Sequence, residues 1–313
     1  MPPTALEVSV VIPIHTQKRW ESLVTAVGAV QRQEPAPRRI VVCVDHNPDL
    51  LQRVRDELPA VHVTANHFAA GASGARNSGA EQVETPLIAF LDSDVRPRHN
   101  WLRELVAPFA DSTVLGTGGF VAPVWLSGRP DWFPEEFLWV VGATFQPTTA
   151  PITTVRNVWS ESMAVRRDAF WRVNGFRVDF GKVGDRSSPE DTDLCLRMSH
   201  AHRGQRWVLA ANSVVDHTVG PERSTLTFFM RRCFQEGFAK VRLGRLHSGR
   251  AELSDEYAYM KRIVSTSLWT YLRSGVREPN LTDLRRGMAI VGGLSAAAAG
   301  AVTAWGTPRH SRR

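Results

Sequence analysis

The most informative part of this chain is Pro86-Leu87-Ile88-Ala89-Phe90-Leu91-Asp92-Ser93-Asp94. Its first six residues form an apolar run, which is typical of a short strand buried on both faces of a sheet. Two carboxylates follow, and neighbouring carboxylates repel each other and resist removal from water. A divalent cation bound to a diphosphate would offset both effects, because Mg²⁺ and Mn²⁺ prefer oxygen ligands. The stretch therefore favours a nucleotide-activated substrate, although an aspartate-rich surface turn has the same composition.

The residues around this stretch alternate between strand and helix patterns. Strands are predicted over residues 8–14, 39–44, 61–64 and 87–91, and helices over residues 20–32, 48–58, 74–84 and 100–109. Strand–helix–strand units with short connections form parallel sheets with right-handed crossovers. Ligands of such sheets bind beyond the carboxyl ends of the strands, which is where Pro13, Asp45 and the aspartate pair fall.

The second half of the chain follows a different pattern. A strand is predicted over residues 114–121, and an aromatic, proline-rich stretch follows at 125–139. The helix predicted over 189–200 has a proline near its start and carboxylates in its first turn, as helix N-termini prefer. Short strands are predicted over 206–210 and 213–217, and long helices over 224–242 and 253–275.

The composition is that of a globular protein. The 313 residues are 43% hydrophobic and 22% charged, which suits one large domain or one domain with an appendage. Cys43, Cys195 and Cys233 show no CxxC spacing, so a disulfide framework or a zinc framework is not expected. With no signal-peptide pattern in residues 1–7, we expect a cytoplasmic protein.

The positive charge is concentrated near the C-terminus. Residues 1–218 hold 22 Lys+Arg and 24 Asp+Glu, whereas residues 219–313 hold 16 and 7. Basic tails suggest anionic lipid, an anionic substrate or nucleic acid, but the aromatic pattern of nucleic-acid modules is absent, so we expect no nucleic-acid partner.

Residues 287–308 carry no charge and are flanked by arginines. An alanine-rich soluble helix or a floppy tail is one interpretation of this segment. The others are a helix lying on the inner face of the cell membrane and a true membrane span.

Four motifs follow one another along the first half: Val10–His15, Val41–Asp45, Gly71–Gly79 and Ile88–Asp94. In this order and spacing they resemble the nucleotide-binding half of a family 2 glycosyltransferase with the GT-A fold. Later stretches resemble the same family's catalytic acidic motif, its late metal-contacting histidine and a basic helix: Ser188–Cys195, Val215–His217 and Arg231–Gly237. The resemblance covers roughly residues 8–240.

The resemblance implies an α/β fold, Rossmann-like, with a mostly parallel sheet, flanking helices and a C-terminal helical extension. It implies a nucleotide-sugar-binding half over residues 1–125 and an acceptor and catalytic half over 126–222. A basic helical region, in contact with a membrane or not, would occupy 223–313.

A nucleotide site is implied at the carboxyl ends of the strands. Its residues would be Pro13, His15, Thr16, Asp45, Gly74, Arg76, Asn77, Asp92 and Ser93. Asp45 could accept the N3–H of uracil or cap the helix after Pro48. Gly71 and Gly74 allow close backbone approach and precede a helix whose N-terminus attracts phosphate. Arg76 could pair with the nucleotide or form a structural ion pair with Asp92.

A metal site and a catalytic base are implied as well. Mn²⁺ or Mg²⁺ would be held by Asp94, by His217, and by Asp92 through water or the ribose, although a lone histidine after a strand is usually structural. Inverting sugar transfer needs a carboxylate that deprotonates the acceptor hydroxyl. Glu190 and Asp191 both fit and the resemblance favours Asp191, whereas the competing role for these acids is helix capping.

The acceptor side is the least defined part of the site. Trp125, Trp132, Arg156, Asn157 and Arg231 are its candidate residues, and the tryptophans could equally be core. The Gln-x-x-Arg-Trp motif of processive synthases is missing, so the implied reaction is the addition of one sugar.

The implied function is transfer of a sugar from a nucleotide-sugar donor, expected to be a UDP-sugar, to a hydroxyl or phosphate. The acceptor would be a small natural product or a lipid-linked molecule. The alternatives are a nucleotidylyltransferase and a catalytically decayed scaffold of the same fold.

Overall fold

The computed structural model describes residues 7–145, 150–179, 189–247, 267–271, 273 and 281–307. The chain forms two compact units. Unit 1 comprises residues 1–122 and 148–217, and unit 2 comprises residues 123–147 and 218–313. The helix predicted over 253–275 lies largely outside the described residues.

Unit 1 is built on a mixed sheet with the strand order β3-β2-β1-β4-β8-β6-β9-β5, and β7 pairs with β9. The strands are β1 (Val8–Ile14), β2 (Ile40–Val44), β3 (His62–Ala65), β4 (Leu87–Leu91), β5 (Val95–Pro97), β6 (Val114–Trp125), β7 (Ile152–Val155), β8 (Ser162–Arg166) and β9 (Arg206–Val219). The first four are parallel, as predicted, whereas β8 pairs with β4 and β5 with β9 in antiparallel fashion. The two short strands predicted over 206–217 are one strand, β9.

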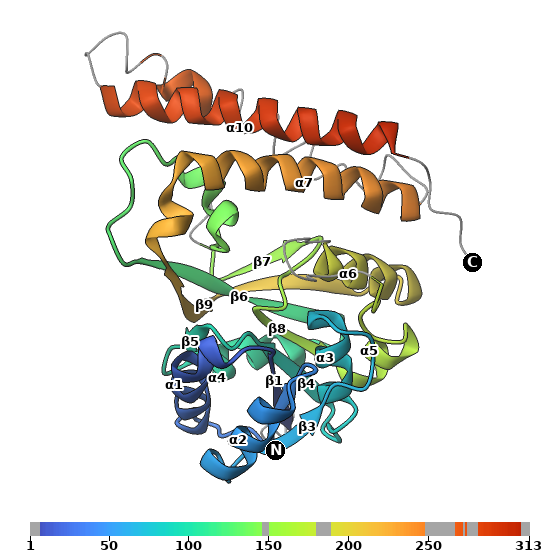
Figure 1. Ribbon diagram of the computed structural model, residues 1–313. Helices are drawn as coiled ribbons and strands as arrows, with labels where there is room; N and C mark the ends of the chain where they lie inside the picture. The colour runs from blue at the N-terminus through green and yellow to red at the C-terminus, as the bar shows by residue number, and fades with distance from the viewer. Residues whose placement is uncertain are drawn as a thin grey trace. The chain divides into compact units, whose positions relative to one another are not determined.

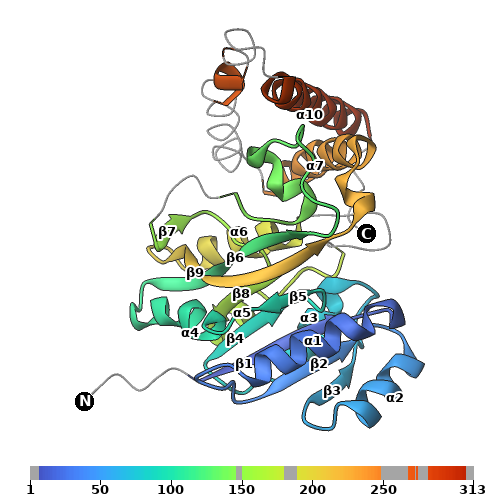
Figure 2. The ribbon, with the colours of Figure 1, turned by 90° about the vertical axis from the view of Figure 1, so that its left-hand side faces the viewer.

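Helices cover both faces of the parallel strands (Figure 1). They are α1 (Trp20–Gln31), α2 (Pro48–Glu57), α3 (Ala72–Ala80), α4 (Trp101–Val106), α5 (Arg167–Arg172) and α6 (Glu190–Ala201), with the 3₁₀ turns η1 (Gln17–Arg19) and η2 (Ala107–Ala110). One buried cluster joins Ile12 of β1 to α1, α2 and α4, and Figure 2 shows the α1 side of the sheet. A second cluster joins Val11 of the same strand to residues of α3, α5 and α6. This two-sided burial explains the continuous apolar runs in the sequence.

The register of the strands brings distant residues to one edge. Ile14 pairs with Val44 at the ends of β1 and β2, so the residues after both strands leave the sheet together. β9 runs antiparallel to β5 and sets His217 opposite Val95, one residue after Asp94.

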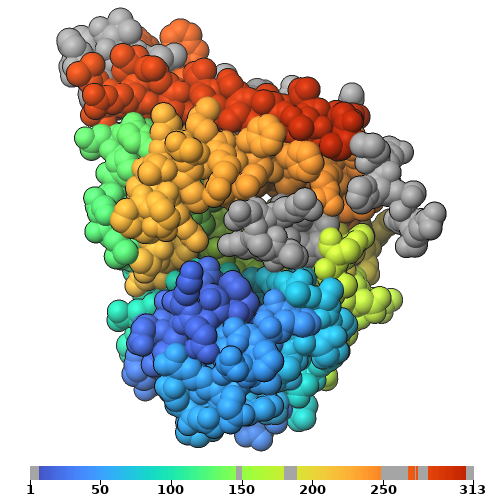
Figure 3. Space-filling view, in the orientation of Figure 1, coloured from blue at the N-terminus to red at the C-terminus, as the bar shows by residue number. Residues whose placement is uncertain are grey.

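Unit 2 contains the 3₁₀ turns η3 (Glu135–Val141) and η4 (Pro221–Ser224) and two long helices, α7 (Leu226–His247) and α10 (Leu281–Gly306). In the space-filling view α10, in red, lies along α7, in orange (Figure 3). A Cβ at Gly237 would lie 1.9 Å from the Ala297 carbonyl oxygen, and one at Gly300 would lie 2.0 Å from that of Phe234. The two backbones therefore approach so closely that only glycine fits at these points. The predicted C-terminal helical extension is confirmed.

Candidate active site

Asp45, directly after β2, organises the loop that leads into α3. Its Oδ1 accepts a hydrogen bond from Asn66 Nδ2 at 2.6 Å, and its Oδ2 accepts one from the Gly71 N–H at 2.9 Å. The N-cap of α2 is Asn47, whose Oδ1 accepts from the Leu50 N–H at 3.1 Å. The sequence allowed two roles for Asp45, a contact with the base or the cap of the helix after Pro48. The structure gives the capping role to Asn47.

The start of α3 is a tight backbone turn. Gly71 has a φ of 138°, which side-chain-bearing residues rarely adopt, and an added Cβ at Gly74 would lie 2.4 Å from the Ala69 carbonyl oxygen. Asn77 is buried and exchanges hydrogen bonds of 2.8 and 2.9 Å with the backbone of Phe176. Its side chain therefore anchors the loop after α5.

Arg76 links α3 to the aspartate pair and to α6. It is 3% exposed, and its Nη2 donates to Asp92 Oδ1 at 2.6 Å while its Nη1 lies 3.4 Å from Glu190 Oε1. Burial disfavours the charge of Arg76, but the carboxylates, Asp92 first, outweigh this and raise its pKa. Burial likewise opposes ionisation of Asp92, yet Arg76 holds the pKa of Asp92 below its usual range. The Arg76–Asp92 contact is one of the two pairings considered from the sequence.

Two acids stand at the first turn of α6. Burial, with help from the neighbouring Asp191 carboxylate, raises the pKa of Glu190 to about 8. Burial also raises the pKa of Asp191, although Arg76 and hydrogen bonds from Ser160 oppose the shift. Asp191 Oδ1 is buried and has no hydrogen-bond partner among the residues that the structure describes. Near neutral pH this acidic pair therefore holds a proton that isolated carboxyls would have lost.

Asp94 and His217 lie close together, because His217 of β9 pairs with Val95, the residue after Asp94. His217 Nε2 lies 3.9 Å from Asp94 Oδ2, and Arg19 Nη2 lies 2.9 Å from the same oxygen. In the described part of the chain no group of three or more His, Cys, Asp or Glu side chains is arranged to hold a metal ion. A carboxylate oxygen and an imidazole nitrogen do suit Mn²⁺, so the residues present fit an ion that takes its remaining ligands from a nucleotide and water.

The remaining predicted nucleotide residues lie at the same edge. Pro13 pairs with Cys43 near the ends of β1 and β2, and His15 and Thr16 follow β1. Thr16 caps η1 by accepting from the Lys18 N–H at 3.4 Å. Ser93, between the two aspartates, is buried.

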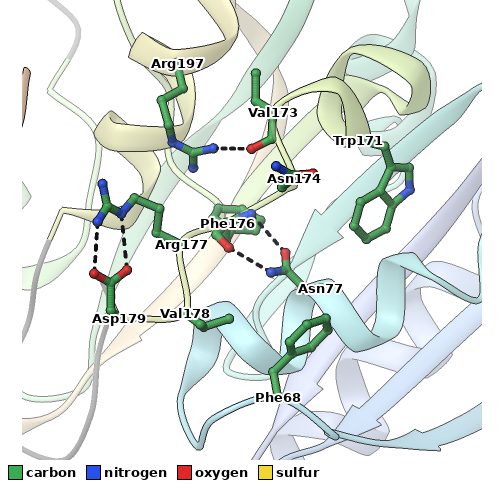
Figure 4. A pocket seen from close by; sticks show the side chains of 10 residues that line it. All are labelled: Phe68, Asn77, Trp171, Val173, Asn174, Phe176, Arg177, Val178, Asp179 and Arg197. Carbon is green, nitrogen blue, oxygen red and sulfur yellow. Dashed lines mark hydrogen bonds and ion pairs between the residues drawn. The ribbon is translucent and has the colours of Figure 1, made fainter. Parts of the chain in front are cut away.

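A hollow of about 550 Å³ lies beside α3 and the loop after α5 (Figure 4). Phe68 and Trp171 offer ring faces to it, and Arg177 and Arg197 offer charged groups. Arg197 is itself tied to the Val173 carbonyl at 2.7 Å and to buried Asp193 at 2.8 Å. The loop that lines the hollow is thus fixed to α6, the helix that carries the acidic pair.

The candidate acceptor residues are divided between the two units. Arg156 and Asn157 belong to unit 1, where Arg156 Nη2 donates to Asn157 Oδ1 at 2.9 Å. The others, Trp125, Trp132 and Arg231, belong to unit 2. Both tryptophans pack on Phe133 with ring centroids 5.2 and 5.5 Å apart, so they contribute to the apolar core of that unit.

Three residues of this edge were not predicted from the sequence. Arg19 contacts Asp94, Ser160 donates to Asp191, and Asn66 donates to Asp45. None stands in a recognisable motif, and each meets its partner only through the tertiary fold. Arg19 alone carried a signal, because an arginine is an unusual residue immediately before a helix.

Comparisons with known proteins agree with this architecture. The family model described as Glycosyl transferase family 2 matches residues 9–173. A relative from Haloferax volcanii, glucosyl-dolichyl phosphate glucuronosyltransferase, is 27% identical over 290 residues, which are 91% of this chain and 92% of the relative.

Two solved structures share the fold. The mannosyltransferase PcManGT from Pyrobaculum calidifontis, in complex with GDP-Man and Mn²⁺, has a TM-score of 0.58 at 17% identity and covers 96% of this chain and 88% of its own. GalNAc-T7 with UDP, GalNAc and Mn²⁺ has a TM-score of 0.55 at 19% identity and covers 83% and 54%. The predicted GT-A fold is therefore confirmed.

Proposed function

Because this chain belongs to glycosyltransferase family 2 and is a glycosyltransferase, we propose that it transfers one sugar with inversion from a UDP-sugar to a hydroxyl of a lipid-linked acceptor. The observation that carries the proposal is the buried Oδ1 of Asp191, which has no hydrogen-bond partner in the described part of the chain. A buried carboxylate oxygen without a hydrogen-bond donor is unfavourable unless a donor arrives in the working complex. An acceptor hydroxyl is such a donor.

In this mechanism Asp191 is the general base. Its raised pKa brings its basicity closer to neutral pH, which favours transfer of a proton from the attacking hydroxyl to Oδ1. Ser160 fixes the carboxylate through its hydrogen bonds, and Arg76 keeps Asp92 ionised beside it. Glu190, protonated near neutral pH, lowers the local negative charge.

The donor would bind at the carboxyl edge of β1, β2 and β4. Its diphosphate would face the N-terminus of α3, where backbone N–H groups and the helix dipole attract anions. Asp94 and His217 would hold Mn²⁺ or Mg²⁺, with Asp92 near the ribose. A bound divalent ion would offset the charge that develops on the leaving diphosphate.

Uracil is the base that we favour because Asp45 is a hydrogen-bond acceptor beside that edge, and uracil presents an N3–H donor. Thymine presents the same N3–H, and guanine also offers N–H donors to a carboxylate, so the nucleotide preference is the first property to measure. We expect calorimetric titration to show binding of UDP that requires Mn²⁺ and is stronger than binding of GDP or dTDP. Asp94→Ala should lose the Mn²⁺ requirement and most of the affinity, because it removes a metal ligand.

The matched control is Asp168→Ala, which removes an exposed carboxylate from the first turn of α5. It should bind UDP like the wild type. If no nucleotide binds with or without Mn²⁺, the proposed donor chemistry is wrong. Tighter binding of GDP would instead reassign the base.

The lipid-linked acceptor is supported by the outer face of α10. Apolar side chains on one side of this helix are exposed, and four of them, Leu281, Met288, Val302 and Trp305, are 65–72% exposed. In the described part of the chain α10 is a helix long and apolar enough to cross a bilayer, but its other face packs on α7. We favour contact with the surface of an anionic membrane, because exposed Arg285 flanks the apolar residues and Arg245 stacks on Trp305. The name of the Haloferax relative, which includes a dolichyl phosphate, agrees with such an acceptor.

Vesicle flotation tests this contact. The wild type should float with vesicles of phosphatidylcholine and phosphatidylglycerol and much less with phosphatidylcholine alone. The double variant Met288→Glu, Val291→Glu should bind the anionic vesicles at least about tenfold more weakly, because two apolar side chains no longer leave water. Val24→Glu, at an exposed apolar position of α1, is the control. Equal binding of all three proteins would contradict the contact through α10.

A further inference from the structure

We propose that Arg19 is a counter-ion of the metal site that ties metal binding to nucleotide binding. Its guanidinium nitrogen Nη2 lies 2.9 Å from Asp94 Oδ2, the same oxygen that lies 3.9 Å from His217 Nε2. An arginine and a divalent cation compete for this oxygen, because their positive charges repel each other at close range. A metal ion that binds there would therefore displace Arg19 from Asp94. The inference rests on the proposed donor and metal chemistry.

The position of Arg19 in the fold is not explained by helix stability. It ends η1, whose N-cap is Thr16, and α1 begins at the next residue. Its side chain makes no capping hydrogen bond, and a cation near a helix N-terminus interacts unfavourably with the helix dipole. The partner of the Arg19 side chain lies outside the helix, at Asp94.

The contact is also easily broken. The Arg19 and Asp94 side chains are 28% and 22% exposed, and ion pairs that water reaches contribute little free energy. Arg76 differs, because its side chain is almost fully buried and is held by ion pairs with both Asp92 and Glu190. Of the two arginines on the aspartate pair, Arg19 is therefore the mobile one.

The destination of Arg19 follows from its chemistry. A guanidinium binds phosphate oxygens with two parallel hydrogen bonds, and Arg19 projects from the turn directly after β1, beside the edge where the diphosphate would lie. With nucleotide present, Arg19 exchanges Asp94 for the diphosphate, and the freed carboxylate becomes available to the metal. In the described residues Asp94 and His217 are the proposed protein ligands of the metal ion. Two ligands do not fill its coordination shell, so the diphosphate would supply further oxygen ligands.

Two titrations of each protein test the exchange. Mn²⁺ binding without nucleotide is followed by the electron paramagnetic resonance signal of the free ion, and UDP binding at saturating Mn²⁺ is followed by calorimetry. Arg19→Gln should bind Mn²⁺ alone about 1.5- to fivefold more tightly, the range expected on release of a partly exposed ion pair. The same variant should bind UDP several-fold more weakly, because it lacks the phosphate contact. UDP would then enhance Mn²⁺ affinity less than in the wild type, as reciprocity of coupled sites requires.

Two further variants control for charge and position. Arg19→Lys keeps the charge and should stay close to the wild type in Mn²⁺ affinity. Arg53→Gln removes an arginine that hydrogen-bonds Gln17 in the same turn but pairs with Glu57, and it should change neither titration. If wild type binds UDP with Mn²⁺ and Arg19→Gln shows unaltered Mn²⁺ affinity, the inference alone is overturned. If wild type binds no UDP at all, the proposed donor chemistry fails and the inference fails with it.

Discussion

Replacing Asp191 by Asn is expected to lower kcat by about 10²–10⁴ while leaving the affinity for UDP and Mn²⁺ unchanged. Asparagine preserves the size of the side chain and can still accept the hydrogen bonds from Ser160, but it cannot take a proton from the acceptor hydroxyl. UDP release from a UDP-sugar gives the turnover, and calorimetry gives the nucleotide affinity. A loss of both together would indicate a disturbed site instead of a missing base.

Asp168→Asn is the control for this experiment, since it removes a carboxylate from the first turn of another helix. It should retain full turnover. Glu190→Gln separates the two acids of α6, because glutamine mimics the protonated form that Glu190 holds near neutral pH. If Glu190→Gln is inactive and Asp191→Asn is active, the base is Glu190 and the assignment made here is wrong.

Replacing Arg76 by Met is expected to destabilise unit 1 by about 3–5 kcal/mol at pH 8, the usual effect of removing one partner from a buried ion pair. Arg76 is the cation that contacts both Asp92 and Glu190, so its loss leaves buried carboxylates to repel one another. Chemical denaturation with urea at several pH values gives the free energy of unfolding. Arg103→Met, which removes an exposed arginine paired with Glu104, should change it by less than about 1 kcal/mol.

The effect should shrink as the pH falls. An acid whose pKa is raised by folding contributes stability that is fully present below its ordinary pKa and is lost as the pH rises through the folded value. For Glu190 this window runs from 4.5 to about 8 already in the wild type. Without Arg76 the pKa of Asp92 loses the main influence that lowers it, and the raised pKa values of Glu190 and Asp191 rise further, so the variant should recover stability at pH 5. A destabilisation that is equal at both pH values would mean that packing, and not charge, is the contribution of Arg76.

The parallel half of the fold could be predicted because its strands are buried on both faces and appear as continuous apolar runs. β5 has three residues, and the apolar part of β8 is only Met163–Val165, so neither gave a comparable run and both were missed. β9 was divided in two because Ala211 and Asn212 interrupt its apolar pattern, although hydrogen bonding continues through them.

The site residues that stand in local motifs could be predicted, whereas the contacts between distant residues could not. Asp92, Asp94, Glu190 and Asp191 stand in short local motifs, and the structure sets all four at the carboxyl edge or at the start of α6. The ion pair of Arg19 with Asp94 and the hydrogen bond of Asn66 to Asp45 join residues with no sequence relationship. Such contacts depend on the register of strands and the direction of turns, which local patterns do not specify.

The pairing of β9 with β5 makes one part of this protein intolerant of insertions and deletions. Ser213, Val215, His217 and Val219 alternate along β9 and are all buried, so they share one face of the strand. A shift of a single residue would turn that whole set to the opposite face and carry His217 away from Asp94. Along this strand, length variation that separated His217 from Asp94 would also remove core packing, so natural variants should differ here by substitution and keep the number of residues constant.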